Sequence, residues 1–232
     1  MNFYSLKWIE GLIYIELDEA LWILDTGSPG SFGSKSSASI CGQTFKIPSS
    51  YMGISISTIG KHAAPRCVGL LGMDILGQFD SNIDLSSESI EISTEKLICD
   101  GIAIQLETAS IEGLEELTSS GVPVIDAHIN GRSFRVVFDT GAEISYLQDD
   151  VINSFPEAGR FKDFYPGFGD FDADTYRIGL TLESEKFFVR CGKLPPLLGI
   201  PLTTLGVQGI VGNEILKNRK VGFFPRRNLM II

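Results

Sequence analysis

The pattern of apolar and polar positions along the chain predicts many short β-strands. Apolar residues, many of them β-branched or aromatic, come in short alternating or continuous runs that turn residues separate. The turn Glu10-Gly11 and the pair Asn130-Gly131 each lie between two such runs, and Asn-Gly is a strong signal for a two-residue hairpin. We therefore expect a mostly β protein with few and short helices. The runs are residues 4–9, 12–17 and 21–24 in the first half and residues 123–129 and 133–138 in the second half.

The same tripeptide follows an apolar run in each half of the chain. Asp25-Thr26-Gly27 and Asp139-Thr140-Gly141 are separated by 114 residues, which is close to half of the 232 residues in the chain. Residues 70–76 and 210–216 also match, because each segment reads as two apolar residues, Gly, two spacers and then Ile-Leu. Two blocks that recur in the same order indicate an internal duplication.

The duplication suggests a division of the chain into two lobes. We place the first copy in an N-terminal lobe of residues 1–98 and the second in a C-terminal lobe of residues 122–232. Residues 99–121 lose the repeated pattern and are expected to form an interlobe connection. Near and within this connection, residues 97–106 are expected to form a strand and residues 111–117 a short helix.

Composition limits the class of protein and its partners. Hydrophobic residues make up 44% and charged residues 21% of the chain, as in an ordinary globular protein. A formal net charge of −10 repels nucleic acid and anionic membrane, so neither is an expected partner. No apolar stretch approaches the roughly 18 residues that span a bilayer. The N-terminus lacks the basic flank and apolar centre of a signal peptide, so we expect a cytoplasmic location unless a leader has been removed.

The cysteines and histidines do not indicate a metal site or a catalytic triad. The four cysteines show no C-x-x-C spacing and have no histidine at ligand spacing, so a zinc site is not expected. Free thiols are favoured, with disulfides within each half as the alternative. His62 and His128 are isolated from any Ser or Cys nucleophile motif, so a histidine-based triad is not expected. The cysteines are Cys41, Cys67, Cys99 and Cys191.

The repeated tripeptide can serve hydrolysis by a pair of carboxylates. Each apolar run delivers an Asp to the end of a sheet, and two such turns meeting across an approximate twofold axis would bring Asp25 and Asp139 together. Like charges that close cannot both ionise, so the pair holds one proton. The ionised Asp then acts as general base on a water, while the protonated Asp hydrogen-bonds the scissile carbonyl. This chemistry needs no metal, cofactor or covalent intermediate.

The neighbours of each Asp support its turn. Gly27 and Gly141 permit backbone conformations and close approaches that a Cβ would block. Hydroxyl groups of threonine can be buried and hydrogen-bonded to hold the turns rigid, a role we expect for Thr26 and Thr140. The next position differs between the halves: Ser28 can donate a hydroxyl to its Asp, whereas Ala142 cannot. The two carboxylates should therefore have unequal environments.

These motifs resemble those of the pepsin-like and retropepsin-like aspartic proteases. The resemblance rests on Asp25-Thr26-Gly27-Ser28, Asp139-Thr140-Gly141-Ala142, Leu70-Leu71-Gly72 and Ile210-Val211-Gly212, and so extends over both halves. It implies a bilobal acid-protease barrel fold with two lobes related by a pseudo-twofold axis and with peptide bound extended between them. In that family the apolar-apolar-Gly segment crosses behind the Asp turn. Both aspartates lie in one chain, so a monomer is expected.

The resemblance also implies a β-hairpin flap that closes over substrate. The flap lies between the Asp turn and the Gly element, an interval of 47 residues from Asp25 to Gly72 and 73 residues from Asp139 to Gly212. The second copy has 26 more residues, so we expect a single flap from the C-terminal lobe, whereas pepsins have theirs in the first lobe. Its expected substrate-binding residues are Tyr165, Gly167, Phe168 and Gly169.

Two alternatives to this flap remain open. The same residues are also compatible with an ordinary surface loop that carries two packing aromatic residues. In the N-terminal lobe, Tyr51-Met52-Gly53 is a weaker candidate for a flap.

The sequence therefore predicts an aspartic endopeptidase whose catalytic residues are Asp25 and Asp139. Its expected partners are a peptide or protein substrate and statine-type inhibitors. The chain is shorter than pepsins, and each lobe is nearer the retroviral size. The alternative is a non-catalytic peptide-binding module that keeps the acid-protease fold.

Overall fold

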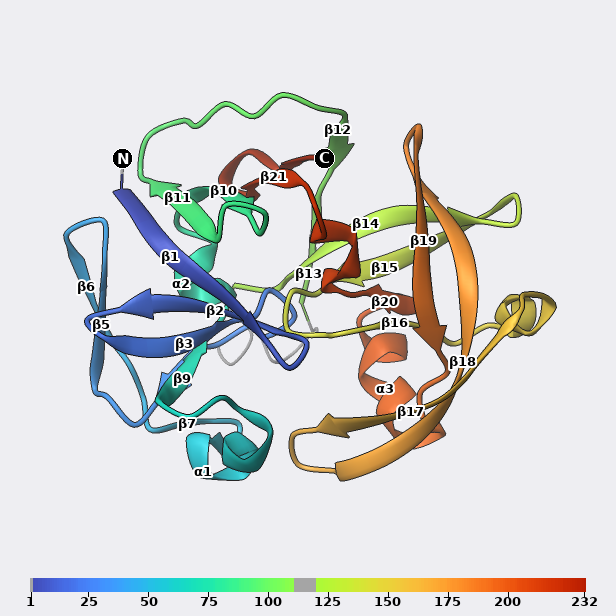
Figure 1. Ribbon diagram of the computed structural model, residues 1–232, viewed down its shortest axis with the longest axis horizontal. Helices are drawn as coiled ribbons and strands as arrows, with labels where there is room; N and C mark the ends of the chain where they lie inside the picture. The colour runs from blue at the N-terminus through green and yellow to red at the C-terminus, as the bar shows by residue number, and fades with distance from the viewer. Residues whose placement is uncertain (1, 111–119) are drawn as a thin grey trace.

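The computed structural model describes residues 2–110 and 120–232 and is mostly β, with 51% strand and 14% helix arranged around two sheet bodies (Figure 1). This confirms the predicted β class and the short helices. The helix expected over residues 111–117 lies outside the described residues. Among those described, no helix is both long enough and apolar enough to span a membrane.

A ten-stranded sheet forms what we call the N-terminal body, together with two small hairpins and short helices (Figure 1). In spatial order its strands are β12 (Ala103–Gln105), β22 (Leu229–Ile231), β21 (Lys220–Phe224), β10 (Asp80–Asp84), β11 (Ser89–Ser93), β1 (Asn2–Ile9), β2 (Leu12–Leu17), β3 (Ala20–Leu24), β9 (Cys67–Leu71) and β4 (Phe32–Gly33). The small hairpins are β5 (Ser37–Ile40) with β6 (Gln43–Lys46), and β7 (Ser50–Tyr51) with β8 (Ile54–Ser55). The helices are α1 (Ile56–Ile59), η1 (Gly60–His62) and α2 (Met73–Leu76).

An eight-stranded sheet forms the C-terminal body. In spatial order its strands are β13 (Glu107–Ala109), β14 (Val122–Ile129), β15 (Arg132–Phe138), β20 (Gly209–Val211), β16 (Ser145–Leu147), β19 (Glu185–Gly192), β18 (Gly169–Leu182) and β17 (Glu157–Tyr165). The helices of this half are η2 (Asp150–Ser154), α3 (Pro196–Thr204), η3 (Asn213–Leu216) and η4 (Pro225–Arg227).

The two predicted hairpin turns are confirmed. Glu10 and Gly11 have φ of 48° and 80° between β1 and β2, and Asn130 and Gly131 have φ of 49° and 76° between β14 and β15. Positive φ at both central residues matches the twist of the strands that the turn joins.

The internal duplication is visible in the strand pairing. β3 runs parallel to β9, with Leu24 opposite Leu71, and β15 runs parallel to β20, with Phe138 opposite Val211. Each strand that ends in an Asp therefore lies beside the apolar-apolar-Gly segment of its own half, as the repeated blocks predict.

The sheets do not follow the predicted lobe boundaries. β21 and β22 belong to residues 122–232, yet they join the N-terminal body, where β21 pairs with β10. The strand expected over residues 97–106 is wrong in extent, because only Ala103–Gln105 pairs, with β22 as its partner. Pairing with a strand from the far end of the chain limits its length, and local sequence does not encode that partner.

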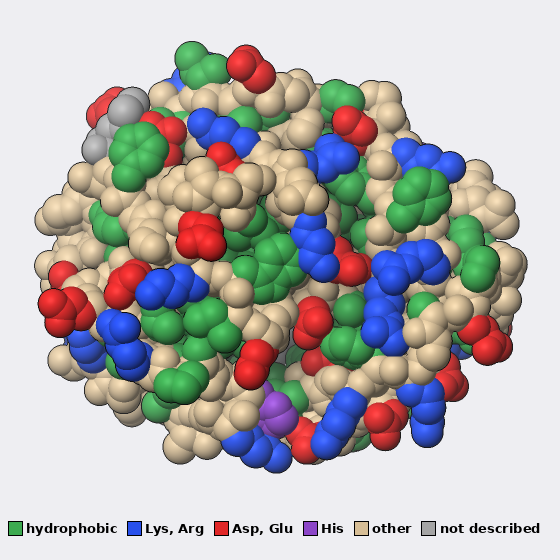
Figure 2. Space-filling model, viewed as in Figure 1, with side chains coloured by type: hydrophobic (Ala, Val, Ile, Leu, Met, Phe, Trp, Pro, Cys, Tyr) green, Lys and Arg blue, Asp and Glu red, His purple; other side chains and the backbone are tan. Residues whose placement is uncertain are grey.

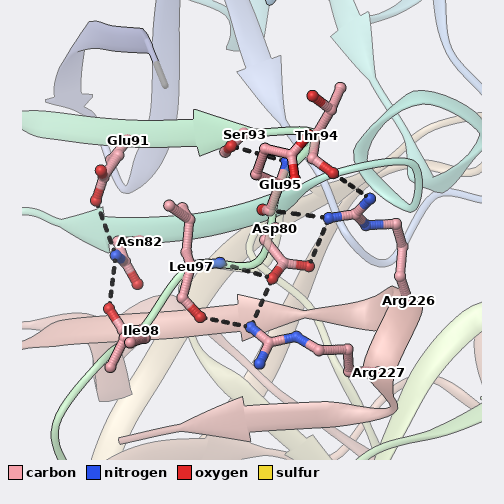
Figure 3. Close-up of polar contacts among 10 residues, drawn as sticks. All are labelled: Asp80, Asn82, Glu91, Ser93, Thr94, Glu95, Leu97, Ile98, Arg226 and Arg227. Atoms are coloured by element: carbon pink, nitrogen blue, oxygen red, sulfur yellow. Dashed lines mark hydrogen bonds and ion pairs between the residues drawn. The ribbon is translucent and has the colours of Figure 1, made fainter.

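One buried carboxylate ties the C-terminal residues to the N-terminal body (Figure 3). Asp80 on β10 is fully buried, and its two oxygens lie 3.1 Å from Arg226 Nη2 and 2.5 Å from Arg227 Nη2. The backbone N–H of Leu97 donates to the same carboxylate at 3.1 Å. Arg226 also donates to the Thr94 carbonyl at 2.6 Å, so the cluster joins three separate segments.

Substituting Asp80→Asn should lower the free energy of unfolding by about 1.5–3 kcal/mol, because the hydrogen bonds from Arg226 and Arg227 lose their charged acceptor while both arginines stay partly solvated. Equilibrium denaturation in urea measures this loss. Asp126→Asn, on the exposed side of β14, is the matched control and should change stability by less than about 0.5 kcal/mol. Equal effects of the two substitutions would contradict the structural role of Asp80.

Candidate active site

The two Asp-Thr-Gly loops meet at the ends of β3 and β15. The backbone N–H of Asp25 donates to the Leu71 carbonyl at 3.1 Å, and that of Asp139 donates to the Val211 carbonyl at 3.0 Å. These bonds continue the parallel pairing of each strand by one residue, so the sheet fixes the backbone position of each aspartate. Leu70-Leu71-Gly72 and Ile210-Val211-Gly212 therefore lie beside the strands that lead into the two aspartates and run parallel to them.

Each loop glycine lies against the aspartate of the other loop. A Cβ at Gly27 would overlap the carboxyl group of Asp139, and a Cβ at Gly141 would lie 2.6 Å from Cγ of Asp25. Both glycines are therefore required by close approach rather than by backbone conformation. This reciprocal contact brings the two predicted catalytic residues together.

The threonines of the two loops exchange hydrogen bonds. The Thr26 N–H donates to Thr140 Oγ1 at 3.0 Å, and the Thr140 N–H donates to Thr26 Oγ1 at 3.0 Å. Each hydroxyl donates onward, Thr26 to the Phe138 carbonyl at 2.7 Å and Thr140 to the Leu24 carbonyl at 2.6 Å. Both side chains are buried, so water does not compete with these bonds. The threonines do more than brace their own turns, because they join the two loops.

The expected role of the Ser28 hydroxyl is wrong. Ser28 Oγ donates to the Gly30 carbonyl at 2.8 Å, and it is the Ser28 backbone N–H that donates to Asp25 Oδ1, at 2.9 Å. A backbone donor is also available where the side chain is alanine, so the Ser28/Ala142 difference does not separate the two carboxylates. In the second loop the Gly141 N–H donates to Asp139 Oδ1 at 2.8 Å.

The two carboxyl groups nevertheless differ in their ionisation. Burial raises the pKa of Asp25 well above that of an ordinary aspartate, and the charge of Asp139 and a hydrogen bond between the two side chains raise it further. Burial also raises the pKa of Asp139, but backbone donors and the hydrogen bond from Asp25 favour its ionised form. The retained proton therefore belongs to the pair of carboxyl groups. The backbone donors to Asp139 belong to Gly141, Gly27 and Ala142.

These raised pKa values set how the pair responds to pH. A group with a raised folded-state pKa contributes stability that is fully present below its unfolded pKa, about 3.9 for Asp. That contribution is lost as pH rises through the folded-state pKa. For both aspartates the sign is the same, so full ionisation of the pair lowers the stability of the fold. The pair keeps a proton at pH values where an ordinary aspartate has lost it.

A matched pair of serines, which was not predicted from the sequence, supports the loops. Ser31 Oγ accepts from the Gly72 N–H at 2.8 Å, and Ser145 Oγ accepts from the Gly212 N–H at 3.2 Å. Both serines are buried and lie six residues after the Asp of their own half. Alignment of the two halves beyond the tripeptide would have found them.

Asn213 is a second functional residue that the sequence analysis missed. Its Nδ2 donates to the Thr140 carbonyl at 3.1 Å and to the Gly11 carbonyl in the β1–β2 turn at 2.7 Å. The fully buried side chain thereby ties the second Asp loop to the N-terminal body. The corresponding residue of the first half is Met73, so no internal match indicates this contact.

The predicted flap is a long β-hairpin of the C-terminal body. β17 has nine residues and β18 has fourteen, and Tyr165 pairs with Gly169 across the tip. Gly167 and Gly169 have φ of 85° and 101°, which only glycine adopts readily. Phe168, 43% exposed, closes the tip by donating its N–H to the Tyr165 carbonyl at 3.0 Å.

Tyr165 lies near the aspartate pair. Partial burial raises the pKa of its phenol, although 37% of the residue is exposed, and the charges of Asp139 and Asp25 raise that pKa further. Of the four predicted tip residues, Tyr165 is therefore the one that the structure brings to the aspartates. The N-terminal candidate, Tyr51-Met52-Gly53, is the turn of the short β7–β8 hairpin, and the Tyr51 ring lies against Gly30.

Three further features concern metal binding, the cysteine thiols and the distribution of surface charge. No group of three or more His, Cys, Asp or Glu within residues 2–110 and 120–232 is arranged to hold a metal ion. The four cysteines are free thiols; Cys191 is buried and the other three are half-buried. Acidic and basic side chains are interspersed over the face in Figure 2.

Comparison with known proteins does not assign a family. No protein-family model matches the chain, and no curated protein matches it either.

The exchanged threonine bonds predict a specific mutational pattern. Thr26→Val should lower the free energy of unfolding by about 2–4 kcal/mol, because the Thr140 N–H and the Phe138 carbonyl each lose a buried partner. Thr26→Ser keeps the hydroxyl and should cost about 1 kcal/mol through the lost methyl group. Urea denaturation distinguishes them. Similar losses for Val and Ser would contradict the role of the hydroxyl.

Proposed function

We propose that the protein is an aspartic endopeptidase in which Asp25 and Asp139 activate a water that attacks a peptide bond. One observation carries the proposal: two carboxyl groups from matched loops each lie against the glycine of the other loop, and both have raised pKa values. A structural ion pair would instead place a cation beside each carboxylate. Paired carboxyl groups with a retained proton are suited to acid and base chemistry.

The two aspartates take different roles in this proposal. In this proposal Asp139 is ionised and is the general base that removes a proton from the water. Asp25 starts protonated, hydrogen-bonds the scissile carbonyl oxygen and gives it this proton as the water adds, so that a neutral gem-diol forms. On collapse the C–N bond breaks, the proton held by Asp139 passes to the leaving amine, and one gem-diol hydroxyl returns its proton to Asp25 as the carbonyl bond re-forms. Asp25 and Asp139 thereby return to their starting protonation.

The proposed fold, peptide-binding position and flap follow from the same pair of aspartate loops. We propose that the two sheet bodies are the lobes of a bilobal acid-protease fold, with an extended peptide bound between them. Both aspartates come from one chain, so a monomer suffices for the site. The β17–β18 hairpin is the flap, and Tyr165 contacts the substrate over the aspartates.

The alternative function is a non-catalytic module that binds extended peptides. Intact aspartates in both loops favour the enzyme, since peptide binding alone does not need a shared proton. Binding of a statine-type inhibitor without turnover of any peptide would favour the module.

Digestion of a peptide library from acid to neutral pH tests the proposal. We expect cleavage by the native chain with a bell-shaped pH dependence, because the pair must hold one proton and not two or none. Asp25→Asn and Asp139→Asn should each lower kcat by at least about 10²–10⁴-fold, the contribution of general acid and base groups.

The control is Asp126→Asn, an exposed carboxylate on β14 that should leave cleavage unchanged. Urea denaturation of each variant verifies that it folds. Activity that persists in Asp25→Asn or Asp139→Asn would rule out the shared-proton mechanism.

A further inference from the structure

The tip of the β17–β18 hairpin reaches from the C-terminal body to the N-terminal body, toward α1 and η1 (Figure 1). Asp170, the second residue of β18, lies at ion-pair distance from η1: its Oδ1 is 3.0 Å from His62 Nε2, and its Oδ2 is 3.5 Å from Lys61 Nζ. Lys162 Nζ on β17 is 3.6 Å from the same carboxylate. Burial acts to raise the pKa of Asp170, but these positive charges outweigh it and lower that pKa.

An aromatic contact accompanies the ion pairs. The rings of His62 and Phe164 are stacked, with centroids 3.9 Å apart and planes 17° from parallel. Phe164 belongs to β17 in the C-terminal body, yet it packs against an apolar cluster of the N-terminal body that includes Ile59 and Ala64. Partly exposed ion pairs contribute little free energy, because water and salt screen them. The stacked rings and the apolar packing therefore contribute most of the stability of this contact.

The register of the hairpin links this contact to the aspartate pair. Phe164 lies directly opposite Asp170 in the antiparallel pairing, so both side chains point to the same face, where His62 is. Tyr165 follows Phe164 and points to the other face, near Asp25 and Asp139. Holding Phe164 and Asp170 against His62 therefore fixes where Tyr165 lies.

We propose that His62, Phe164 and Asp170 form a latch that positions Tyr165 over the aspartate pair, and that substrate enters when this latch opens. His62 is thus a positioning residue, and it comes from the body opposite to the one that carries the hairpin. The consequence for catalysis rests on the proposed function, whereas the latch itself does not.

Hydrogen exchange measured on peptides that cover residues 160–172 tests the latch without any substrate. His62→Ala should speed exchange in this segment about tenfold, the range expected for loss of a stacked aromatic contact, because the hairpin opens more often. His62→Phe keeps a ring on Phe164 and should stay within about threefold of the native chain. Asp170→Asn should give a rise of about two- to threefold that disappears in high salt.

The matched control is His128→Ala, which removes the other histidine of the chain from an exposed position on β14. It should leave exchange of the hairpin unchanged. Unchanged exchange in His62→Ala, or exchange that rises equally throughout the protein, would overturn the latch. The second result would mean that His62 only contributes to global stability.

The kinetics of a statine-type inhibitor separate the latch from the proposed function. In His62→Ala, association and dissociation rates should both rise about tenfold while Kd stays within about threefold, because a latch that closes before and after binding slows both steps. A Kd that changes tenfold with unchanged association would overturn the gating role. If no inhibitor binds the native chain but exchange responds as predicted, the latch stands and the proposed function fails.

Discussion

The exchanged hydrogen bonds between Thr26 and Thr140 are the constraint on which the site depends. They hold two loops from distant parts of the chain at one fixed separation, with both hydroxyl groups buried. At that separation only glycine fits at positions 27 and 141, and each carboxyl group faces the opposite loop. Burial then raises both pKa values, and the charge of Asp139 raises that of Asp25 further, so the pair retains a proton. The raised pKa values thus follow from the close packing of the two loops.

Both halves contribute a threonine that bonds the opposite loop, but the residues around the loops differ between the halves. The backbone donor to Asp25 is the Ser28 N–H, three residues further on, whereas the donor to Asp139 is the Gly141 N–H, two residues further on. The added residues of the second half form a hairpin that crosses to the N-terminal body, where it meets His62. The last strands of the chain cross as well, through the Asp80 cluster. Duplication therefore accounts for the carboxyl pair, whereas the residues found only in the second half make further contacts between the two sheet bodies.

The strands and turns were predictable from the sequence, because they depend on residues that are close together in the chain. Alternating apolar residues and the Asn130-Gly131 turn predicted strands and hairpins that the structure confirms, and the two tripeptides predicted the meeting of the loops. Contacts across the molecule were not predictable in this way. The Ser28 hydroxyl binds the Gly30 carbonyl because the backbone already supplies the donor to Asp25. The isolated His62 acquires a role only through folding, since its partners lie about a hundred residues further along the chain.

The shared proton is the central claim, and titration of the two carboxyl carbons by NMR in aspartate-labelled protein tests it directly. Asp25→Asn and Asp139→Asn assign the resonances. We expect both signals to move together in two steps, with the step of Asp25 well above the ordinary value of about 3.9. After Asp25→Asn, the Asp139 signal should show a single step at lower pH than the second step of the native pair. Two independent single steps near the ordinary value in the native chain would contradict the account.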